Sequence, residues 1–523
     1  MRRTLLAMGT RRRLWVFWPL ALACLAAAWY LVALGIHGLE LARFPYQSDY
    51  GEGALLNEVH RLLSGQGIYH NDVAPPFIVG NYPPVYLALV AVLQALGLGQ
   101  GFFAGRLLSG TAILTASVLA GLVVRRVAAG TEPRPGPAAL WATALVAAGL
   151  MAAQIAIWRW GPLMRVDSLA LAFTMAGLYR VASRPERAAS AWPWFLLAVL
   201  TRQSEIDGLV ASLWLLWPHA RAQALRLLGL WALGLALAVG GLELGTHGQF
   251  LVHIVVYNAN HWSLGSAFSA WMTWVFTAGG LPLLLLALGG LPVARRAPLG
   301  RLLTGFAGAA WLISVTVGKV GAAVNYFFPS IAAAAMLASL VALVPRRTAS
   351  LLLAAYLVGI PPLNDAQGLA GQVARSLTAY HDLGTPGFRQ LGWSAAKGGR
   401  DPAQQSLVAL LARTPGPILC ENMGALVLAG HQVYFQPFEL TQAARDGNWN
   451  PAPLVRQAEQ GAFPLVVLDF PLQTPAEWST DRWPPALLEA LDHRYQAAGV
   501  LGSYHLYVPR SVGPTGTAAA GAS

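Results

Sequence analysis

Long apolar runs separated by short arginine clusters limit most strongly how this chain can fold. The first run, Leu14–Ile36, contains no charged residue and exceeds the roughly 20 residues that a helix needs to cross a bilayer. Charged residues make up only 11% of the chain, against about 25% in soluble proteins. The sequence therefore predicts an α-helical polytopic membrane protein.

The arginine clusters predict how these helices are oriented, because cytoplasmic loops are enriched in Lys and Arg. With the Arg-rich N-terminus in the cytoplasm, the later doublets also fall inside, which gives about eleven spans in a plasma (inner) membrane. We therefore expect no nucleic-acid partner, despite the net charge of +12. The predicted spans are Leu14–Ile36, Phe102–Val124, Ala139–Ile157, Leu163–Tyr179, Trp192–Leu200, Leu209–Trp217, Leu227–Leu244, Trp271–Val293, Leu302–Val317, Ala322–Val344 and Leu351–Pro361.

Two stretches depart from the pattern of full spans. Val85–Leu98 is too short to cross comfortably, and we interpret it as an interfacial or re-entrant helix. Trp192–Leu200 and Leu209–Trp217 form a hairpin of half-length helices with the polar tip Thr201–Glu205. Polar, non-helical backbone at membrane depth is tolerated only against protein or a water-filled cavity, so this tip is a candidate site element.

The polarity of the chain changes near residue 363 and predicts its domain organisation. Residues 1–362 form the transmembrane domain, with a first external loop at 40–84. Residues 363–510 form a small extracytoplasmic α/β domain, and the Gly/Ala/Thr/Ser-rich residues 511–523 form a disordered tail. The helix-like and strand-like segments of the α/β domain are Gln404–Leu411, Pro417–Cys420, Val433–Phe435, Pro464–Phe470 and Tyr504–Val508.

Two acids stand near the start of the first external loop. Asp49 and Glu52 precede the apolar residues Leu55, Val59 and Leu62, which fall on one face of a helix. We therefore expect an amphipathic helix along the outer membrane surface. Asp at the N-cap with Glu three residues later is close to a capping box, so the spacing supports a structural role as well as a catalytic one. The two roles can coexist, because a capped helix start holds a carboxylate rigidly.

Arg165 and Asp167 lie at the outer end of a predicted span. An arginine there can simply extend toward the interface, and an acid can stabilise the first turn of the helix. For Arg165 alone the interfacial interpretation is the better one. Acids at membrane depth are costly and usually functional, so Asp167 is a functional candidate.

Further polar residues lie where other spans meet the outer face. Arg202 and Glu205 at the hairpin tip are spaced to pair with each other. Lys319 stands alone in a region that otherwise uses arginine, which fits either a contact with an anion such as phosphate or an anchor at the end of a span. His261 is more typical of an interfacial residue than of a ligand.

Carboxylates and cations thus converge on one membrane face, as transfer from a membrane-bound phosphate ester requires. A carboxylate can activate the acceptor hydroxyl, and cations can stabilise the departing phosphate. At this point the sequence resembles the GT-C glycosyltransferases, which include protein O-mannosyltransferases, aminoarabinose transferases and mannosyltransferases that use polyprenyl-phosphate sugars. The resemblance is carried by Asp49–Glu52, Asn81–Tyr86, Phe103–Leu107, Arg165–Asp167, Leu200–Ser204 and Asn325–Phe327.

The resemblance implies a GT-C-like fold with interfacial helices, and it implies roles for individual residues. Asp49 would be the catalytic base, Glu52 a supporting carboxylate and Asp167 the second acidic position. The residues implied for substrate binding are Arg165, Arg202, Gln203, Lys319, Asn325, Tyr326, Tyr82 and His261. In some subfamilies the two first-loop acids are adjacent, whereas here Tyr50 and Gly51 separate them, which leaves open which acid is the base.

We therefore expect a glycosyltransferase that moves a sugar, with inversion, from a polyprenyl-phosphate donor to a glycan, lipid or protein acceptor at the outer face. The alternatives are a lipid-linked oligosaccharide ligase or polymerase, a transporter or flippase, and a non-catalytic assembly subunit. Transporters usually show two related halves, whereas the Asp49 loop has no second copy. The sequence indicates no definite cofactor, although Asp49 and Asp167 could hold a divalent ion such as Mg²⁺ or Mn²⁺ through oxygen ligands.

Overall fold

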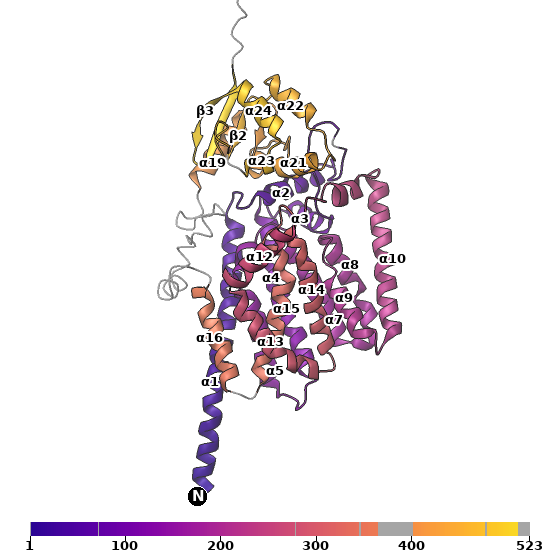
Figure 1. Cartoon of the computed structure of the whole chain (residues 1–523), viewed down its shortest axis with the longest axis vertical. Coiled ribbons are helices and arrows are strands. Elements are labelled where there is room, and N and C mark those ends of the chain that lie inside the picture. The colour runs from indigo at the N-terminus through magenta and orange to yellow at the C-terminus, as the bar shows by residue number, and fades with distance from the viewer. Residues whose placement is uncertain are drawn as a thin grey trace, which may run out of the picture.

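The computed structural model describes residues 2–71, 73–277, 279–344, 347–363, 401–475 and 478–510. A helical bundle forms the larger part of the molecule, and a smaller domain with a four-stranded sheet covers one end of it (Figure 1). The N-terminus lies at the opposite end. The predicted tail 511–523 and the stretch 364–400 lie outside the described residues.

The bundle begins with α1 (Arg2–Arg43) and ends with α16 (Arg347–Leu363). Its other elements are α2 (Tyr50–Leu63), α3 (Val85–Ala95), α4 (Phe103–Ala128), α5 (Pro137–Ala152), α6 (Ile155–Trp160), α7 (Asp167–Ser183), η1 (Pro185–Ala191), α8 (Trp192–Thr201), α9 (Asp207–Leu216), α10 (Arg221–Gly245), α11 (Gln249–Leu251), η2 (Val252–Val256), α12 (Leu264–Thr277), α13 (Gly280–Arg296), α14 (Gly300–Ile313), η3 (Ser314–Gly318), η4 (Val324–Phe327), α15 (Phe328–Ser339) and η5 (Leu340–Leu343).

Long apolar helices confirm that the chain is an integral membrane protein. By length and composition, 5 of the helices in the described residues could cross a membrane, and 6 could if the bent pair α12–α13 counts as one span. Other predicted spans are shorter apolar helices, such as α5 and α9. The predicted count of about eleven spans is therefore not confirmed, although the helical polytopic fold is.

The predicted span Trp271–Val293 is not one straight helix. It is divided between α12 and α13, which are bent by 80° relative to each other. Gly279 precedes α13 with a φ of 71°, a left-handed conformation that glycine adopts without the penalty of a side chain. This conformation interrupts the helix, and periodicity alone does not reveal such a break.

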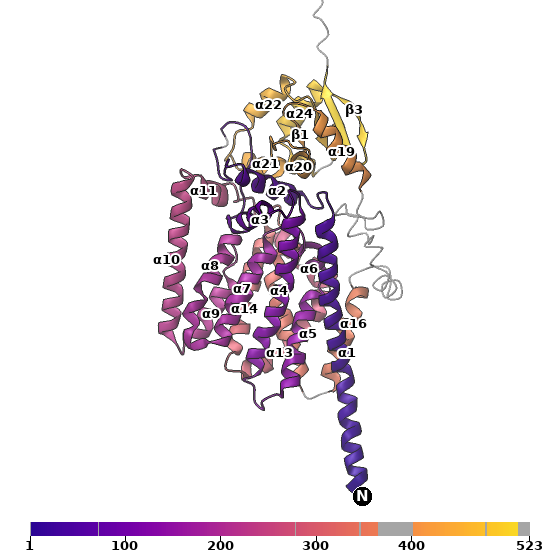
Figure 2. The same cartoon turned by 180° about the vertical axis from the view of Figure 1, so that it is seen from behind.

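The two short segments that the sequence singled out are confirmed as short elements. α3 contains 11 residues, about 16 Å at 1.5 Å per residue, which cannot span a hydrocarbon core of about 30 Å. It lies beside α2, beneath the C-terminal domain (Figures 1 and 2). α8 and α9 form the predicted hairpin and carry the polar tip between them.

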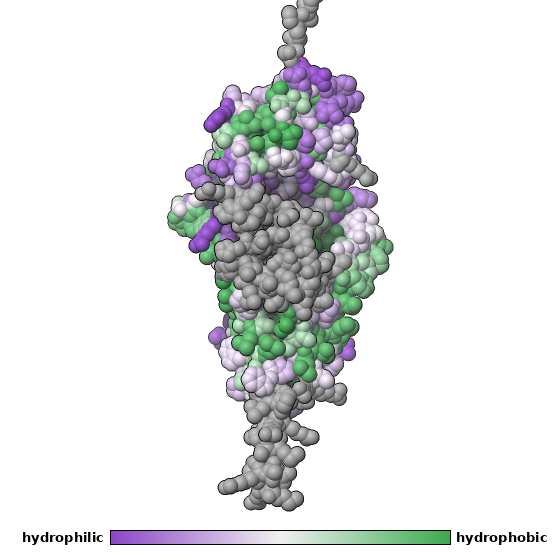
Figure 3. Space-filling view, turned by 90° about the vertical axis from the view of Figure 1, so that its left-hand side faces the viewer, coloured by the Kyte–Doolittle hydropathy of each residue, from purple (hydrophilic) through white to green (hydrophobic). Residues whose placement is uncertain are grey.

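The surface reflects the division into bundle and C-terminal domain. On the face shown in Figure 3, hydrophobic residues dominate the flanks of the bundle, and strongly hydrophilic ones concentrate on the C-terminal domain. α10 lies at the outer edge of the bundle (Figures 1 and 2), and its exposed leucines include Leu233, Leu237 and Leu244. Such a surface suits a lipid environment, where exposed apolar side chains carry no penalty.

The C-terminal domain surrounds a mixed sheet with the order β1-β2-β4-β3. β1 pairs parallel with β2, whereas β4 pairs antiparallel with both β2 and β3. The strands are β1 (Leu419–Cys420), β2 (Val466–Leu468), β3 (Tyr495–Leu501) and β4 (Tyr504–Pro509), and the helices are α19 (Pro402–Arg413), α20 (Met423–Leu428), α21 (Pro437–Arg445), α22 (Ala452–Glu459), α23 (Ser479–Arg482) and α24 (Pro485–Arg494).

Two details of the predicted α/β domain need correction. The segment Val433–Phe435 is not a strand of the sheet; Phe435 forms only an isolated bridge with Phe77 of the first external loop. β3 was not predicted, and it pairs irregularly with β4 between Ala497 and Gly499. The other predicted strands and the predicted helix correspond to β1, β2, β4 and α19.

The first external loop docks the C-terminal domain onto the bundle. The Phe77 amide donates to the Tyr434 carbonyl over 2.8 Å, and the Gln436 amide donates to the Phe77 carbonyl over 2.9 Å. Gln47 accepts a 2.7 Å hydrogen bond from the amide of Gly424 through its side chain. Backbone hydrogen bonds fix orientation closely, so the loop that carries the predicted acids also positions the C-terminal domain.

Candidate active site

Asp49 caps the helix that the first-loop pattern predicted. It is the N-cap of α2, and its side chain accepts a 3.0 Å hydrogen bond from the Gly51 amide. The Glu52 side chain accepts in return from the Asp49 amide at 3.3 Å, which completes a capping box. The capped start of α2 therefore holds Asp49 in a fixed orientation.

Glu52 is fully buried and saturated with hydrogen bonds. Its Oε1 and Oε2 accept from Arg106 Nε and Nη2 at 2.7 and 2.6 Å, and neither side chain is exposed. The amides of Met164 and Ser48 donate to it as well, at 2.8 and 2.9 Å. A carboxylate with this many donors is held in its charged form, and it joins the first loop to α4 and to the segment before α7.

The Asp49 carboxylate keeps access to solvent while pairing with an arginine. Arg165 Nη1 lies 2.9 Å from Asp49 Oδ2, and both side chains are 14% exposed. Burial raises the pKa of Asp49 above its ordinary value, although Arg165 opposes this effect. Gly51 makes room for the pair, because a Cβ there would lie 1.7 Å from Arg165 Nη1. Arg165 is therefore a partner of Asp49 and not merely an interfacial residue.

A cavity of about 430 Å³, called here the central cavity, lies beside this pair. Three cations line it: Arg165, Arg202 and Lys319. Lys319 Nζ donates to Asn258, to the carbonyl over 2.6 Å and to the side-chain oxygen. Burial, and next the nearby Arg202, lower the pKa of Lys319 to about 8. Such a collection of cations suits a phosphate group.

Asp167 holds Arg202, the cation at the hairpin tip, in place. Arg202 Nε lies 3.2 Å from Asp167 Oδ1, and Asn325 donates to the same oxygen over 2.9 Å. Arg202 also lies 3.3 Å from Glu205, as the sequence spacing suggested, and 4.5 Å from the ring centroid of Tyr326. Arg202 therefore reaches the central cavity in an orientation that α7, η4 and the hairpin tip itself determine together.

The remaining residues that were predicted to bind substrate do not all line the central cavity. Tyr82 and Gln203 line the central cavity; Arg165 Nη2 donates to the Tyr82 hydroxyl over 3.3 Å, and Gln203 donates to the Asn81 carbonyl over 3.2 Å. His261 is exposed and does not belong to the described lining of the cavity. Its role in binding substrate therefore stays a prediction without support from this geometry.

Several residues near Asp49 were not predicted from the sequence. Tyr50 donates from its hydroxyl to Glu439 over 3.0 Å and accepts from the Phe438 amide over 2.9 Å. Asp49 itself lines a smaller pocket against the C-terminal domain, together with Glu421 and Arg482 among others. The first-loop residues Asp49 and Tyr50 are hundreds of positions away in the sequence from these residues of the C-terminal domain, and no local motif connects the two groups.

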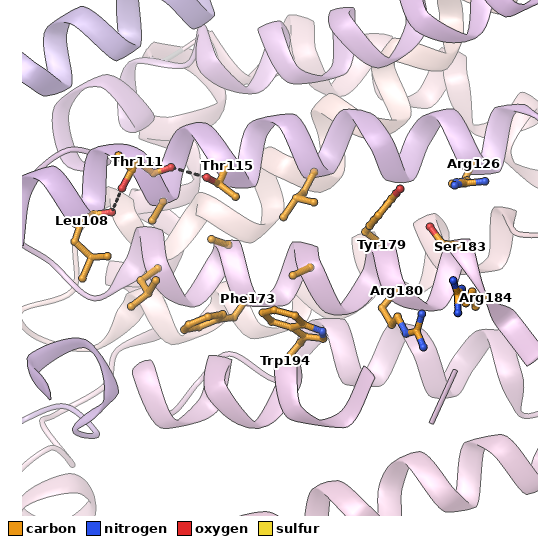
Figure 4. A pocket seen from close by; sticks show the side chains of 15 residues that line it. Leu108, Thr111, Thr115, Arg126, Phe173, Tyr179, Arg180, Ser183, Arg184 and Trp194 are labelled. Atoms are coloured by element: carbon orange, nitrogen blue, oxygen red, sulfur yellow. Dashed lines mark hydrogen bonds between the residues drawn. The ribbon is translucent and has the colours of Figure 1, made fainter. Parts of the chain in front are cut away.

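A larger groove of about 720 Å³ lies between α4, α7 and α8, away from these acids. Figure 4 shows its apolar side chains along the helices, with Arg126, Arg180 and Arg184 together at one end. The described lining of the groove offers no carboxylate, whereas the smaller pocket beside the C-terminal domain includes Asp49.

The possible divalent ion at Asp49 and Asp167 stays a prediction. Among the described residues, no group of three or more His, Cys, Asp and Glu side chains could hold a metal ion. Each of the two acids instead has its own arginine partner, Arg165 and Arg202 respectively. In this structure an arginine of the chain supplies the positive charge beside each of these carboxylates.

Neither a protein-family model nor a curated protein matches the sequence. Solved structures do match its fold. ArnT from Cupriavidus metallidurans bound to undecaprenyl phosphate is 16% identical, with a TM-score of 0.58 over 92% of this chain and 98% of that chain. ArnT from the same organism in the apo state is 14% identical, also with a TM-score of 0.58, over 91% of this chain and 96% of that chain.

A second membrane glycosyltransferase shows the same likeness. The oligosaccharyltransferase AglB from Archaeoglobus fulgidus, in complex with an inhibitory peptide and a dolichol-phosphate, is 13% identical, with a TM-score of 0.51 over 95% of this chain and 74% of that chain. At such identities the likeness concerns the fold. ArnT and AglB are both membrane glycosyltransferases of the GT-C superfamily. The chain therefore has a GT-C fold with a small C-terminal α/β domain, as the sequence predicted.

Proposed function

We propose that this chain transfers a sugar from a polyprenyl-phosphate-linked donor to an acceptor at the outer face of the membrane, with inversion at the sugar. One observation supports this most strongly: a partly exposed carboxylate, Asp49, pairs with an arginine that lines a cavity with two further cations, Arg202 and Lys319. The two kinds of neighbour with this fold have bound undecaprenyl phosphate and dolichol-phosphate, which are lipids of this class.

The proposed step is a single displacement. The acceptor oxygen attacks the anomeric carbon on the face opposite the phosphate, and the bond between that carbon and the phosphate oxygen breaks. The acceptor proton passes to Asp49, and polyprenyl phosphate leaves with the bonding electrons. Inversion follows, because the nucleophile and the leaving group occupy opposite faces of the same carbon.

The cavity cations act on the leaving group. Fixed charges that face the departing phosphate stabilise the transition state without reorganising, and Arg165, Arg202 and Lys319 are already held by their partners. Lys319, with its pKa lowered to about 8, is still mostly protonated at neutral pH. It therefore brings a positive charge to the cavity under physiological conditions.

Two of the acids serve a different purpose in this proposal. Glu52 orients the loop that carries Asp49, because all its contacts are with groups of the protein backbone or with Arg106. Asp167 orients Arg202 through the 3.2 Å contact. Asp49 is the base because, of the three acids, it is the one that lines either of the two cavities described above.

The proposed orientation places the C-terminal domain outside the cytoplasm and the N-terminus inside. The two lie at opposite ends of the bundle (Figures 1 and 2). The Arg125–Arg126 doublet ends α4, far along that helix from Arg106, which binds the first-loop residue Glu52. Arginine-rich ends favour the cytoplasm, so the site near Asp49 would face outward in a plasma (inner) membrane.

A transfer assay tests the reaction class. Membranes that contain the protein would receive radiolabelled polyprenyl-phosphate sugars, or the corresponding nucleotide sugars, and the label that reaches any glycan, lipid or protein would be followed. We expect transfer from at least one lipid-linked donor and none directly from the nucleotide sugars, with the opposite anomeric configuration in the product. Transfer directly from a nucleotide sugar, or retention of configuration, would contradict the proposal.

A further inference from the structure

A small cavity of about 200 Å³ separates Asp49 from the C-terminal domain. The first external loop supplies one wall, from Gln47 to Tyr50, and the C-terminal domain supplies the other. Pockets that bury whole drug-sized ligands occupy roughly 300 to 1,000 Å³. This cavity, called here the interdomain pocket, is smaller, so it suits one ring or a terminal group of a larger molecule.

Asp49 is placed where the interdomain pocket and the central cavity approach each other. Its carboxylate belongs to the lining of the interdomain pocket, whereas its partner Arg165 lines the central cavity. Tyr50 lines both, and its ring centroid lies 5.2 Å from Arg482 Cζ of the C-terminal domain. A group in the interdomain pocket would therefore lie next to Asp49, whose partner Arg165 lines the central cavity.

The C-terminal wall carries a charged network with an unused acceptor. Arg482 Nη1 lies 2.8 Å from Glu421 Oε1 and 3.3 Å from Asp469 Oδ2. Trp483 Nε1 donates to the other oxygen of Glu421. Asp469 Oδ1 is buried and has no hydrogen-bond partner among the described residues. A buried carboxylate oxygen without a donor is unusual, and here it belongs to a residue that lines the pocket.

Neutral hydrogen-bonding groups complete the lining. Asn422 donates to the Tyr504 hydroxyl over 2.8 Å and to Gln404 over 3.1 Å, and all three line the pocket. Amides and hydroxyls both donate and accept hydrogen bonds. Asn422 Oδ1 also accepts from the Ala425 amide, and Gln404 Nε2 donates to Gln47 and Asp401. The groups that these described contacts leave for a hydroxylated ligand are the hydrogen of the Tyr504 hydroxyl and Asp469 Oδ1.

The charges of the lining select among polar ligands. Asp49, Glu421 and Asp469 contribute three acids, against the one arginine Arg482. An anionic group would be repelled, because Arg482, the one cation of the described lining, is already paired with Glu421 and Asp469. Hydroxyl groups, in contrast, can donate to the carboxylate oxygens. The aromatic ring of Tyr50 beside the network adds a stacking surface for a sugar ring.

We propose that the interdomain pocket is the acceptor site and takes a terminal, uncharged sugar ring of a glycan, which the C-terminal domain recognises through Asp469 and Tyr504. The donor then occupies the central cavity, and the acceptor hydroxyl meets Asp49 from the interdomain pocket. The assignment as an acceptor site rests on the proposed function, but sugar binding in the pocket can be measured without any transfer reaction.

The test is photoaffinity labelling of the purified full chain in nanodiscs. The probes are octyl glycosides of glucose, galactose and mannose that carry a diazirine on the octyl chain, and labelled peptides are identified by mass spectrometry. Unlabelled octyl glycosides and octyl phosphate serve as competitors. Asp469→Asn and Tyr504→Phe remove pocket groups conservatively, and Asp446→Asn, at an exposed residue of the same domain, is the matched control.

We expect at least one glycoside to label peptides that contain the first-loop residues 47–50 or the pocket residues of the C-terminal domain. Octyl glycoside should compete and octyl phosphate should not. Asp469→Asn should weaken competition by roughly tenfold, about 1.4 kcal/mol, Tyr504→Phe should weaken it as well, and Asp446→Asn should leave it unchanged.

Three results would overturn the proposal: no glycoside labels these peptides, octyl phosphate competes as well as the glycoside, or both pocket variants bind like the control. The proposed function fails separately, when no lipid-linked donor supports transfer. Glycoside binding in the pocket without transfer would retain the pocket as a sugar site and remove only its role as acceptor site.

Discussion

Replacing Arg106 by methionine should destabilise the protein by about 3–5 kcal/mol. The guanidinium of Arg106 is fully buried and donates to both carboxylate oxygens of Glu52 and to the carbonyls of Leu41, Phe44 and Tyr46. Removal of one member of a buried ion pair costs this much because the other charge stays buried without a partner. The carbonyls lose their donor in addition, so the cost should not fall below this range.

The assay is unfolding of the purified chain in mixed micelles with a rising fraction of ionic detergent, followed by tryptophan fluorescence. Arg43→Met at the exposed end of α1 is the matched control, with an expected change within about 0.5 kcal/mol. Adding Glu52→Gln to Arg106→Met should recover part of the loss, because it removes the uncompensated charge. Equal stability of Arg106→Met and Arg43→Met would refute the reasoning.

Three further variants test the geometry around Asp49. The wild-type kcat/KM for the donor should fall as the pH rises past about 8, where Lys319 loses its positive charge. Lys319→Arg should abolish this decline, because a guanidinium stays protonated. A decline that persists in the variant would show that another group causes it. Gly51→Ala should reduce transfer by about tenfold or more, because its Cβ would lie 1.7 Å from Arg165 Nη1; a normal rate would show that the ion pair is dispensable. Tyr50→Phe should cost about 1–3 kcal/mol in the unfolding assay, since buried Glu439 loses its donor; an unchanged midpoint would contradict this.

Sequence reasoning succeeded where the signal was local. The spacing of Asp49 and Glu52 predicted a capped amphipathic helix, and α2 begins with that capping box. The hairpin tip was predicted from one polar stretch between two short apolar runs, and the pairing of Arg202 with Glu205 was expected from their spacing. Each of these features depends on residues within a few positions of one another, so periodicity and capping rules could find them.

The rest depends on distant contacts. Arg106 lies within the stretch Phe103–Leu107 that carried the resemblance, but its partner Glu52 is 54 positions away, and no spacing rule connects the two. The same holds for Tyr50 and Glu439, which are 389 positions apart. Residues that meet only through tertiary packing leave no periodic pattern, so the interdomain pocket could not be predicted from the sequence.

The span count was not confirmed and β3 was not predicted, for two physical reasons. Helices inside a bundle can be shorter than the bilayer when neighbouring protein satisfies their ends, and hydropathy cannot identify a break such as that at Gly279. β3 contains Ala497 and Gly499 at its irregular pairing, and both residue types are depleted in strands. Its pairing with β4 therefore determines its conformation more than its own composition does.

The most direct test of the central claim is the transfer rate of Asp49→Asn, with donor binding measured on the same preparation. Asparagine caps a helix about as well as aspartate, so α2 should keep its start while the base is lost. We predict that kcat falls by about 10²- to 10⁴-fold with donor affinity retained, because the cations of the central cavity remain. A kcat within a few-fold of that of the wild-type protein would contradict the assignment of Asp49 as the base.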